Sequence, residues 1–253
     1  MIGARWSVEH DMSVRRVGEG AEIVWIHGLG ESSVSFEPVV ARMPGFAHTL
    51  VDLPGYGRSP WPVETPGLDA LADHLARWLD GRAPAALIGH SMGGVLATLV
   101  AERTHVRAVV DVEGNLSFGD CNFSRQVLPF SVDDWRARGF AELRAKVYAD
   151  GTTHPPLRGY HAAMCFASPD AFHEHAAELV AISKAETLAA RLAVLPPPVL
   201  YVAGGPPDGV CAASRALLDR HRVRWISIEP SGHWVYLDQL ERFVDEVSRF
   251  LAE

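Results

Sequence analysis

The chain has 253 residues, 48% of them hydrophobic and 21% charged, a length and composition that suit one soluble domain with a large core. Its formal net charge of −8 argues against nucleic acid or an anionic membrane as a partner, because both are bound through clustered Lys and Arg. No stretch approaches the ~20 apolar residues of a membrane helix, and residues 1–20 lack the apolar centre of a signal peptide. We therefore expect a cytoplasmic protein.

Short apolar runs alternate with helical patterns along most of the chain. In chain order they are one or two weak strands over 5–17, strands at 22–26 and 48–51, a helix over 68–79, a strand at 85–88, a helix over 92–102 and a strand at 106–112. After a long insertion come a strand at 198–203, a strand-like run at 225–228 and a helix over 235–251. Strands that alternate with helices predict an α/β fold with a mostly parallel, doubly wound sheet.

The insertion between the strands at 106–112 and 198–203 has a different character. Residues 114–197 contain helix-like stretches at 132–148 and 170–193, many aromatic side chains and no convincing strand. More than eighty residues at one sheet edge are too many for a loop, so we expect a helical cap over a core formed by residues 1–113 and 198–253. A few of its aromatic residues are expected to line a substrate pocket.

A candidate nucleophile lies in Gly89-His90-Ser91-Met92-Gly93, which matches the pattern G-x-S-x-G between a predicted strand and a predicted helix. Such a strand–turn–helix lifts the serine to the carboxyl edge of the sheet, where the helix N-terminus favours developing negative charge. We therefore predict Ser91 as the nucleophile. The backbone N–H groups of Met92 and of Leu29, in the loop 27–30, are the expected oxyanion donors.

A serine hydroxyl needs a base, and His233 is the best placed of the twelve histidines. It follows the strand-like run at 225–228 and precedes the last helix, in the order serine, acid, histidine. His90 is excluded as the base because neighbours in a tight turn cannot easily form the nucleophile–base hydrogen bond. His173 and His175 are two residues apart on a predicted helix and point apart, so no metal site is expected there.

Two carboxylates compete to orient His233. Asp208 lies in the loop after the strand at 198–203, and Glu113 ends the strand at 106–112, so both are expected at the carboxyl edge. The ordinary alternative for Asp208 is a turn residue before glycine. For Glu113 it is a buried carboxylate that accepts backbone N–H bonds, which is rarer. We favour Asp208, with Glu113 as the alternative acid.

Together, HGLG, DLPGYGRS, GHSMGG, the GGPPDGV loop and SGHW resemble the α/β-hydrolase superfamily, over nearly the whole chain outside the cap. The resemblance implies a serine hydrolase in which the position of Asp208 usually holds the acid. Haloalkane dehalogenases and zearalenone-type lactonases are members that instead use a Glu at the position of Glu113. Branches whose nucleophile is Asp do not fit Ser91, and the HGGG motif of the hormone-sensitive-lipase kind is not found.

These observations predict a serine hydrolase that cleaves an ester or lactone of a small, largely apolar molecule through an acyl-enzyme on Ser91. A small-molecule substrate is the expected partner, and neither a metal nor an organic cofactor is expected. Fold resemblance alone leaves other activities open. One alternative is a biosynthetic thioesterase, cyclase or C–C bond hydrolase, and another is a non-catalytic small-ligand receptor of the same fold.

Overall fold

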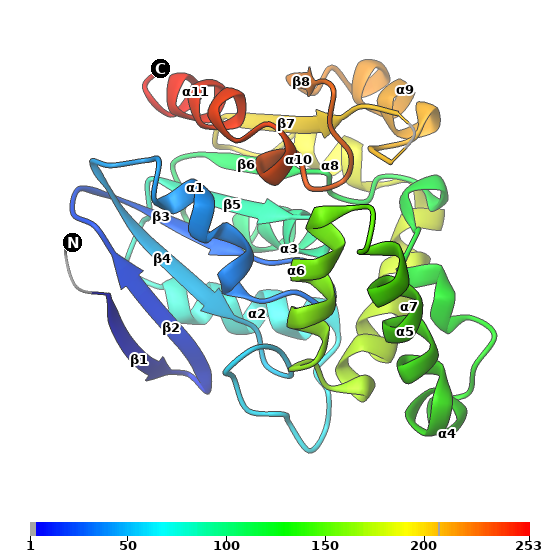
Figure 1. Cartoon of the computed structure of the whole chain (residues 1–253). Coiled ribbons are helices and arrows are strands. Elements are labelled where there is room, and N and C mark those ends of the chain that lie inside the picture. The colour runs from blue at the N-terminus through cyan, green and yellow to red at the C-terminus, as the bar shows by residue number, and fades with distance from the viewer. Residues whose placement is uncertain (1–3, 207) are drawn as a thin grey trace.

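The computed structural model describes residues 4–206 and 208–253 (Figure 1). Within them, an eight-stranded sheet has the spatial order β1-β2-β4-β3-β5-β6-β7-β8. Its strands are β1 (Arg5–Glu9), β2 (Met12–Val17), β3 (Ala21–Ile26), β4 (Phe46–Asp52), β5 (Ala86–His90), β6 (Val109–Val112), β7 (Val199–Gly204) and β8 (Trp225–Ile228). β2 is antiparallel to both β1 and β4, and the other neighbours are parallel. The predicted mostly parallel sheet is confirmed.

The central strands are buried on both faces. Every residue of β5 and β6 is buried, as is the carboxyl half of β3. Strands covered on both sides need apolar residues at successive positions, which explains why the sequence shows continuous apolar runs there and little alternation. The strands end at one edge, and the loops that leave this edge carry the residues of the candidate site.

Helices cover both faces of the sheet (Figure 1). α1 (Glu37–Val40), α10 (Val235–Asp238) and α11 (Leu240–Leu251) lie on one face; α2 (Leu68–Leu79), α3 (Met92–Ala101), α8 (Leu188–Ala193) and α9 (Ala212–His221) lie on the other. All ten residues of α3 are buried, as its almost wholly apolar sequence requires.

The helix predicted over 235–251 is divided in two. Gln239 separates α10 from α11, with φ −131° and ψ 56°, and its Nε2 donates to the carbonyl of Pro230 at 2.6 Å. This break lets α10 pack against β7 while α11 follows the face of the sheet. β6 also begins three residues later than the predicted strand at 106–112.

Residues 114–197, which we call the helical insert, are all described and contain helices and loops without a strand. Besides α8 they form η2 (Phe118–Asp120), η3 (Ser124–Val127), α4 (Val132–Asp134), the π-turn η4 (Trp135–Gly139), α5 (Phe140–Asp150), α6 (Pro155–Met164) and α7 (Pro169–Ala185). The helix predicted over 170–193 is interrupted at Glu186, which has φ +52°. α6 was not predicted because two prolines and a glycine disfavour a helix interior, although proline is well suited to the first helical turn.

The helical insert is joined to the core through α7. The buried His175 accepts a hydrogen bond from the Tyr56 hydroxyl at 2.8 Å through Nδ1, and its Nε2 donates to the carbonyl of Pro66 at 2.8 Å. Burial lowers the pKa of His175 to about 4, so the ring is neutral and keeps this pattern of one donor and one acceptor. Glu178 accepts the N–H of Leu68 at 2.5 Å, at the N-terminus of α2.

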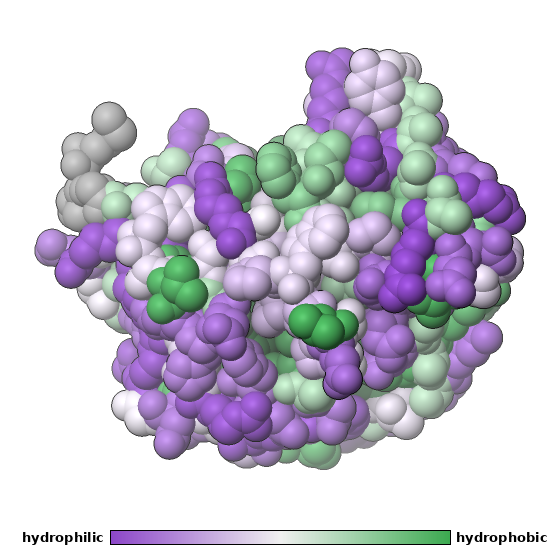
Figure 2. Space-filling view, turned by 90° about the horizontal axis from the view of Figure 1, so that it is seen from below, coloured by the Kyte–Doolittle hydropathy of each residue, from purple (hydrophilic) through white to green (hydrophobic). Residues whose placement is uncertain are grey.

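Figure 2 shows one face of the surface, on which hydrophobic residues are scattered among hydrophilic ones, as is usual for globular proteins. In the part of the chain that the structure describes, no helix combines the length and hydrophobicity that crossing a membrane requires.

Candidate active site

The nucleophile turn joins β5 to α3. Ser91 lies between them with φ +54° and ψ −121°, a backbone conformation that is strained for a residue with a side chain. Both glycines of the motif are required by close packing. A Cβ at Gly89 would lie 2.0 Å from the carbonyl oxygen of Gly93, and a Cβ at Gly93 would lie 2.0 Å from that of Ile26. The predicted strand–turn–helix around Ser91 is therefore present.

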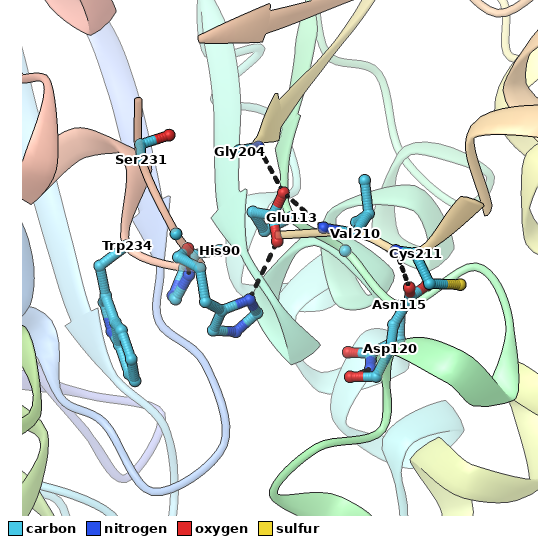
Figure 3. Close-up of polar contacts among 12 residues, drawn as sticks. His90, Glu113, Asn115, Asp120, Gly204, Val210, Cys211, Ser231 and Trp234 are labelled. Carbon is cyan, nitrogen blue, oxygen red and sulfur yellow. Dashed lines mark hydrogen bonds and ion pairs between the residues drawn. The ribbon is translucent and has the colours of Figure 1, made fainter. Parts of the chain in front are cut away.

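His233 lies in the loop between β8 and α10, and its Nδ1 is 3.1 Å from Oε2 of Glu113. Glu113 directly follows β6, has φ +57° and is 1% exposed. Its other oxygen, Oε1, accepts the N–H of Gly204 at 2.5 Å and that of Val210 at 3.1 Å (Figure 3). These bonds satisfy a carboxylate that would otherwise be costly to bury.

Glu113, and not the favoured Asp208, is the carboxylate that lies within hydrogen-bond distance of His233 in the structure. Asp208 is exposed in the loop after β7, and among the described residues no hydrogen bond joins it to His233. The reason lies in how this loop is held. Its backbone N–H groups at Gly204 and Val210 point to Glu113, and the N–H of Cys211 donates to Asp120 at 2.9 Å (Figure 3). Glu113, the alternative acid, therefore occupies the position next to the imidazole.

A cavity of about 640 Å³ is lined by both Ser91 and His233. One wall comes from the core and the other from the helical insert. Its large apolar and aromatic lining residues are Leu29, Phe123, Leu143, Val147, Leu157, Tyr160, Leu179 and Trp234. Charged lining side chains include the exposed Arg125, Lys146 and Asp150, of which Lys146 and Asp150 form an ion pair at 2.7 Å.

The two expected oxyanion donors lie close to Ser91, Met92 directly after it in the chain and Leu29 in the loop 27–30. A Cβ at Gly28 would be 3.2 Å from Cβ of Ser91, so the loop 27–30 runs directly against the serine. Among the described residues, neither the N–H of Leu29 nor that of Met92 donates to a protein acceptor. The loop is fixed by His27, whose Nδ1 donates to the carbonyl of Gly28 at 2.8 Å and whose Nε2 accepts the N–H of Leu53 at 3.0 Å. Burial lowers the pKa of His27, which keeps the ring neutral as this pattern requires.

A sequence model described as "Alpha/beta hydrolase family" matches residues 23–246. The chain belongs to the alpha/beta hydrolase family. Over 46% of its length it is 28% identical to a pimeloyl-[acyl-carrier protein] methyl ester esterase from Shewanella oneidensis, covering 44% of that protein. The chain thus spans less than half the length of this curated relative.

Solved structures support the same fold for this alpha/beta hydrolase. An esterase from Exiguobacterium antarcticum superposes with a TM-score of 0.78 at 20% identity, covering 96% of each chain. The enol-lactonase from Burkholderia xenovorans LB400 gives a TM-score of 0.77 at 18% identity, covering 98% of this chain and all of that one. At such identities the likeness concerns the fold.

Sequence reasoning missed one further residue of the site in this alpha/beta hydrolase, Glu31, and it missed the interactions of His90. Both side chains are almost fully buried, and Nδ1 of His90 is 3.0 Å from Oε2 of Glu31. Burial by itself would raise the pKa of Glu31, but the attraction and hydrogen bond of His90, with N–H bonds from Gly28 and Trp234, lower it to about 2. Burial opposes the charged form of His90, yet Glu31 and the carbonyl of His233 raise its pKa above the usual value.

The remaining histidines of interest serve the packing of the helical insert. Nε2 of His173 donates to the carbonyl of Phe130 at 3.2 Å, whereas His175 binds residues of the core, so the two side chains point to different neighbours. In the described ranges, no group of three or more His, Cys, Asp and Glu side chains is arranged to hold a metal ion.

Proposed function

We propose that this protein is a serine hydrolase that cleaves carboxylic esters or lactones of small, largely apolar molecules through an acyl-enzyme on Ser91. One observation carries the proposal: the strained serine and a histidine bound to a buried carboxylate line the same cavity. The similar proteins named above, a methyl ester esterase, an esterase and an enol-lactonase, support carboxylic ester bonds as the target.

In this proposal Glu113 is the acid that orients the base. The His233 Nδ1–H donates to Glu113, which leaves Nε2 as the free, basic nitrogen of the neutral ring. Nε2 takes the proton of Ser91 while Oγ bonds to the carbonyl carbon of the ester. Glu113 stabilises the imidazolium that forms, and its bonds from Gly204 and Val210 keep the carboxylate in place.

The negative charge that develops on the carbonyl oxygen needs donors that no protein group already occupies. Within residues 4–206 and 208–253 the N–H groups of Leu29 and Met92 meet this requirement, and Met92 adds the favourable field of the α3 N-terminus. The tetrahedral intermediate collapses as His233 gives its proton to the leaving alcohol oxygen. Nε2 of His233 then takes a proton from water, whose oxygen attacks the acyl carbon. As the bond from that carbon to Oγ of Ser91 breaks, His233 gives this proton to Oγ and the carboxylic acid product leaves.

The cavity supports a small and largely apolar substrate. Its volume of about 640 Å³ lies within the range of about 300–1,000 Å³ that small-molecule sites occupy. Phe123, Tyr160 and Trp234 pack against one another with ring centroids 4.9–5.9 Å apart and form an aromatic wall. We propose that the helical insert acts as the cap of this cavity and selects the substrate through α5, α6 and η3.

The proposal is tested with p-nitrophenyl acetate and p-nitrophenyl butyrate. Ser91→Ala should abolish turnover of both, and a fluorophosphonate probe should label the wild-type protein but not the variant. The control is Ser248→Ala, a change in α11 away from the cavity, which should keep wild-type rates. Unchanged ester hydrolysis by Ser91→Ala would overturn the assignment of the nucleophile. A folded wild-type protein that neither hydrolyses esters nor reacts with the probe would instead favour a non-catalytic ligand receptor.

A further inference from the structure

A second buried acid–histidine pair lies beside the first. The two ring nitrogens of His90 each face an acceptor: Oε2 of Glu31 is 3.0 Å from Nδ1, and the carbonyl oxygen of His233 is 2.9 Å from Nε2. The Tyr236 hydroxyl also lies near Nδ1, but at 3.5 Å it is farther away than the Glu31 oxygen. A neutral imidazole has one N–H and makes only one of these bonds as a donor, whereas an imidazolium makes both. The carbonyl cannot donate at all. The contacts therefore require a protonated His90 as long as Glu31 is ionised.

The ionised form of Glu31 is stabilised by hydrogen bonds to both of its oxygens. Besides His90, the backbone N–H of Gly28 donates to Oε2 at 2.9 Å, and the indole N–H of Trp234 donates to Oε1 at 2.6 Å. A proton shared between Oε2 and Nδ1 of His90 is therefore favoured on the imidazole, because these two further donors stabilise the negative charge of the carboxylate. Its pKa of about 2 agrees with this arrangement.

These bonds connect three separate parts of the candidate site. Glu31 holds Gly28, which precedes the oxyanion donor Leu29, and it holds Trp234, which follows the base His233. His90 precedes Ser91 in the nucleophile turn and binds the backbone of His233. The oxyanion loop, the nucleophile and the base are thus tied to one another through a single pair of side chains.

We propose that Glu31 and His90 form a carboxylate–imidazolium positioning pair that aligns the oxyanion loop, Ser91 and His233, and that catalysis requires this pair to be charged. The inference rests on the proposed serine hydrolase function, because it assigns the pair a role in that site. Neither residue touches the reacting atoms in this scheme. Both act through the backbone and side chains that they hold.

The surroundings of His90 favour its charged form. The titratable groups that face it from the neighbouring elements are His27, Glu31, Asp111, Glu113, His233 and Tyr236. Burial keeps His27 and Tyr236 neutral by lowering the pKa of the histidine and raising that of the tyrosine, and it raises the pKa of Asp111 to about 8. The carboxylates of Glu31 and Glu113 remain, and both attract a positive charge on His90.

Loss of the His90 proton at high pH breaks one of its two hydrogen bonds. Either Glu31 is left as a buried carboxylate without its cationic partner, or the carbonyl of His233 is left without a donor. Both outcomes loosen a part of the site that turnover needs. We therefore expect kcat to fall at alkaline pH as His90 loses its proton, with little change in KM.

The protonation state of His90 can be measured directly in the whole protein. With ¹⁵N-labelled histidine, NMR should show both ring nitrogens of His90 protonated at pH 7.5. The signals are assigned by their loss in His90→Gln or, should that variant not fold, by through-space contacts to Tyr236, whose ring centroid is 5.1 Å away. A single protonated nitrogen at pH 7.5 would overturn the proposal. This readout does not depend on activity, so it is separate from the test of Ser91.

Kinetics then test the positioning role. Glu31→Gln keeps the shape of the side chain but removes the charge, so kcat should fall about 10–100-fold while KM stays within about threefold. The pH at which kcat falls on the alkaline side of its pH profile should also decrease by about one unit or more, because a neutral amide stabilises the imidazolium of His90 less than a carboxylate does. We call this fall the alkaline limb. A purely structural role would lower the rate without moving that limb, and this result, like an unchanged kcat, would overturn the proposal.

The matched control is Glu178→Gln, which removes a partly buried carboxylate that also accepts a backbone N–H but lies at the junction of α7 and α2. It should leave both kcat and the alkaline limb at their wild-type values. If Ser91→Ala retains activity while NMR shows the imidazolium, the proposed function fails and the ionic state of the pair stands. If Ser91→Ala is inactive and Glu31→Gln keeps the wild-type pH profile, the positioning role fails alone.

Discussion

The carboxylate of Glu113 binds Nδ1 of His233 with one oxygen, and with the other it accepts the N–H of Gly204 at the end of β7 and that of Val210 in the loop that follows. This relationship joins the ends of β6 and β7 to the loop after β8. The same carboxylate therefore fixes the candidate base and holds the loop that contains Asp208. A carboxylate in this position cannot be replaced without affecting both.

The assignment of the acid predicts unequal effects of two substitutions. Glu113→Gln should lower kcat about 10³–10⁴-fold on an aryl ester, because an amide cannot stabilise the imidazolium and favours the wrong tautomer of His233. Asp208→Asn should change kcat less than about threefold, because the exposed Asp208 side chain makes no hydrogen bond to His233 in the described residues. Steady-state kinetics of the two purified variants distinguish Glu113 from Asp208 as the acid. A larger loss in Asp208→Asn would show that the acid is Asp208.

The position of Ser91 was predictable from sequence because its geometry is local. A buried strand, two glycines and an apolar helix are adjacent in the chain, and together they force the turn that the structure shows. The sheet was predictable for a similar reason, since strands buried on both faces must be continuously apolar. The predicted ends of strands and helices differ by a few residues from the observed ends where tertiary contacts determine them, as at Gln239.

The carboxylate beside His233 and the second pair were not predictable in this way, because long-range contacts determine them. Choosing Glu113 over Asp208 requires knowing that the N–H of Gly204, 91 residues away, turns inward. Glu31 meets His90 across 59 residues and Trp234 across 203. One feature of the sequence pointed to Glu113: a carboxylate directly after a buried strand needs hydrogen-bond donors or a charged partner.

The close packing at Gly93 predicts that it cannot be replaced by alanine. A Cβ there would lie 2.0 Å from the carbonyl oxygen of Ile26, and backbone on both sides cannot give way. We expect Gly93→Ala to destabilise the fold by more than about 3 kcal/mol, or to prevent folding, as overpacking against rigid backbone does.

Gly159 provides the matched comparison. It is exposed within α6, and no atom lies within 4 Å of the position that its Cβ would take. Gly159→Ala should therefore stabilise the protein by about 0.5–1 kcal/mol, because alanine favours a helix interior. Urea unfolding of both variants measures the difference. A well-folded Gly93→Ala protein of wild-type stability would contradict the packing seen around the nucleophile turn.

Asp111 predicts a pH dependence of stability. Burial raises its pKa to about 8 in the folded protein from an ordinary value of 3.8, and its Oδ2 has no hydrogen-bond partner among the described residues. Between these two pH values the folded chain keeps a proton that the unfolded chain has lost. Stability therefore falls as pH rises, by up to about 1.4 kcal/mol per pH unit.

Asp111→Asn removes this titration and keeps an oxygen for the N–H of Gly114, which Oδ1 accepts at 2.9 Å. Relative to the variant, the wild-type protein should lose about 2–3 kcal/mol of unfolding free energy between pH 5 and pH 7.5. The measurement is urea unfolding of both proteins at the two pH values. If their difference in stability is the same at both, Asp111 is not protonated in the folded state.

The junction between α7 and the loop after β4 predicts a specific loss of stability. In Tyr56→Phe the buried Nδ1 of His175 loses the one donor that the described residues provide, and the neutral ring cannot move into water. We expect a cost of about 1–3 kcal/mol, typical of a buried acceptor left unsatisfied. The control is Tyr148→Phe in α5, where the ring is 66% exposed and a change within about 0.5 kcal/mol is expected. Equal effects of the two substitutions in urea unfolding would mean that the Tyr56 hydroxyl does not hold the helical insert to the core.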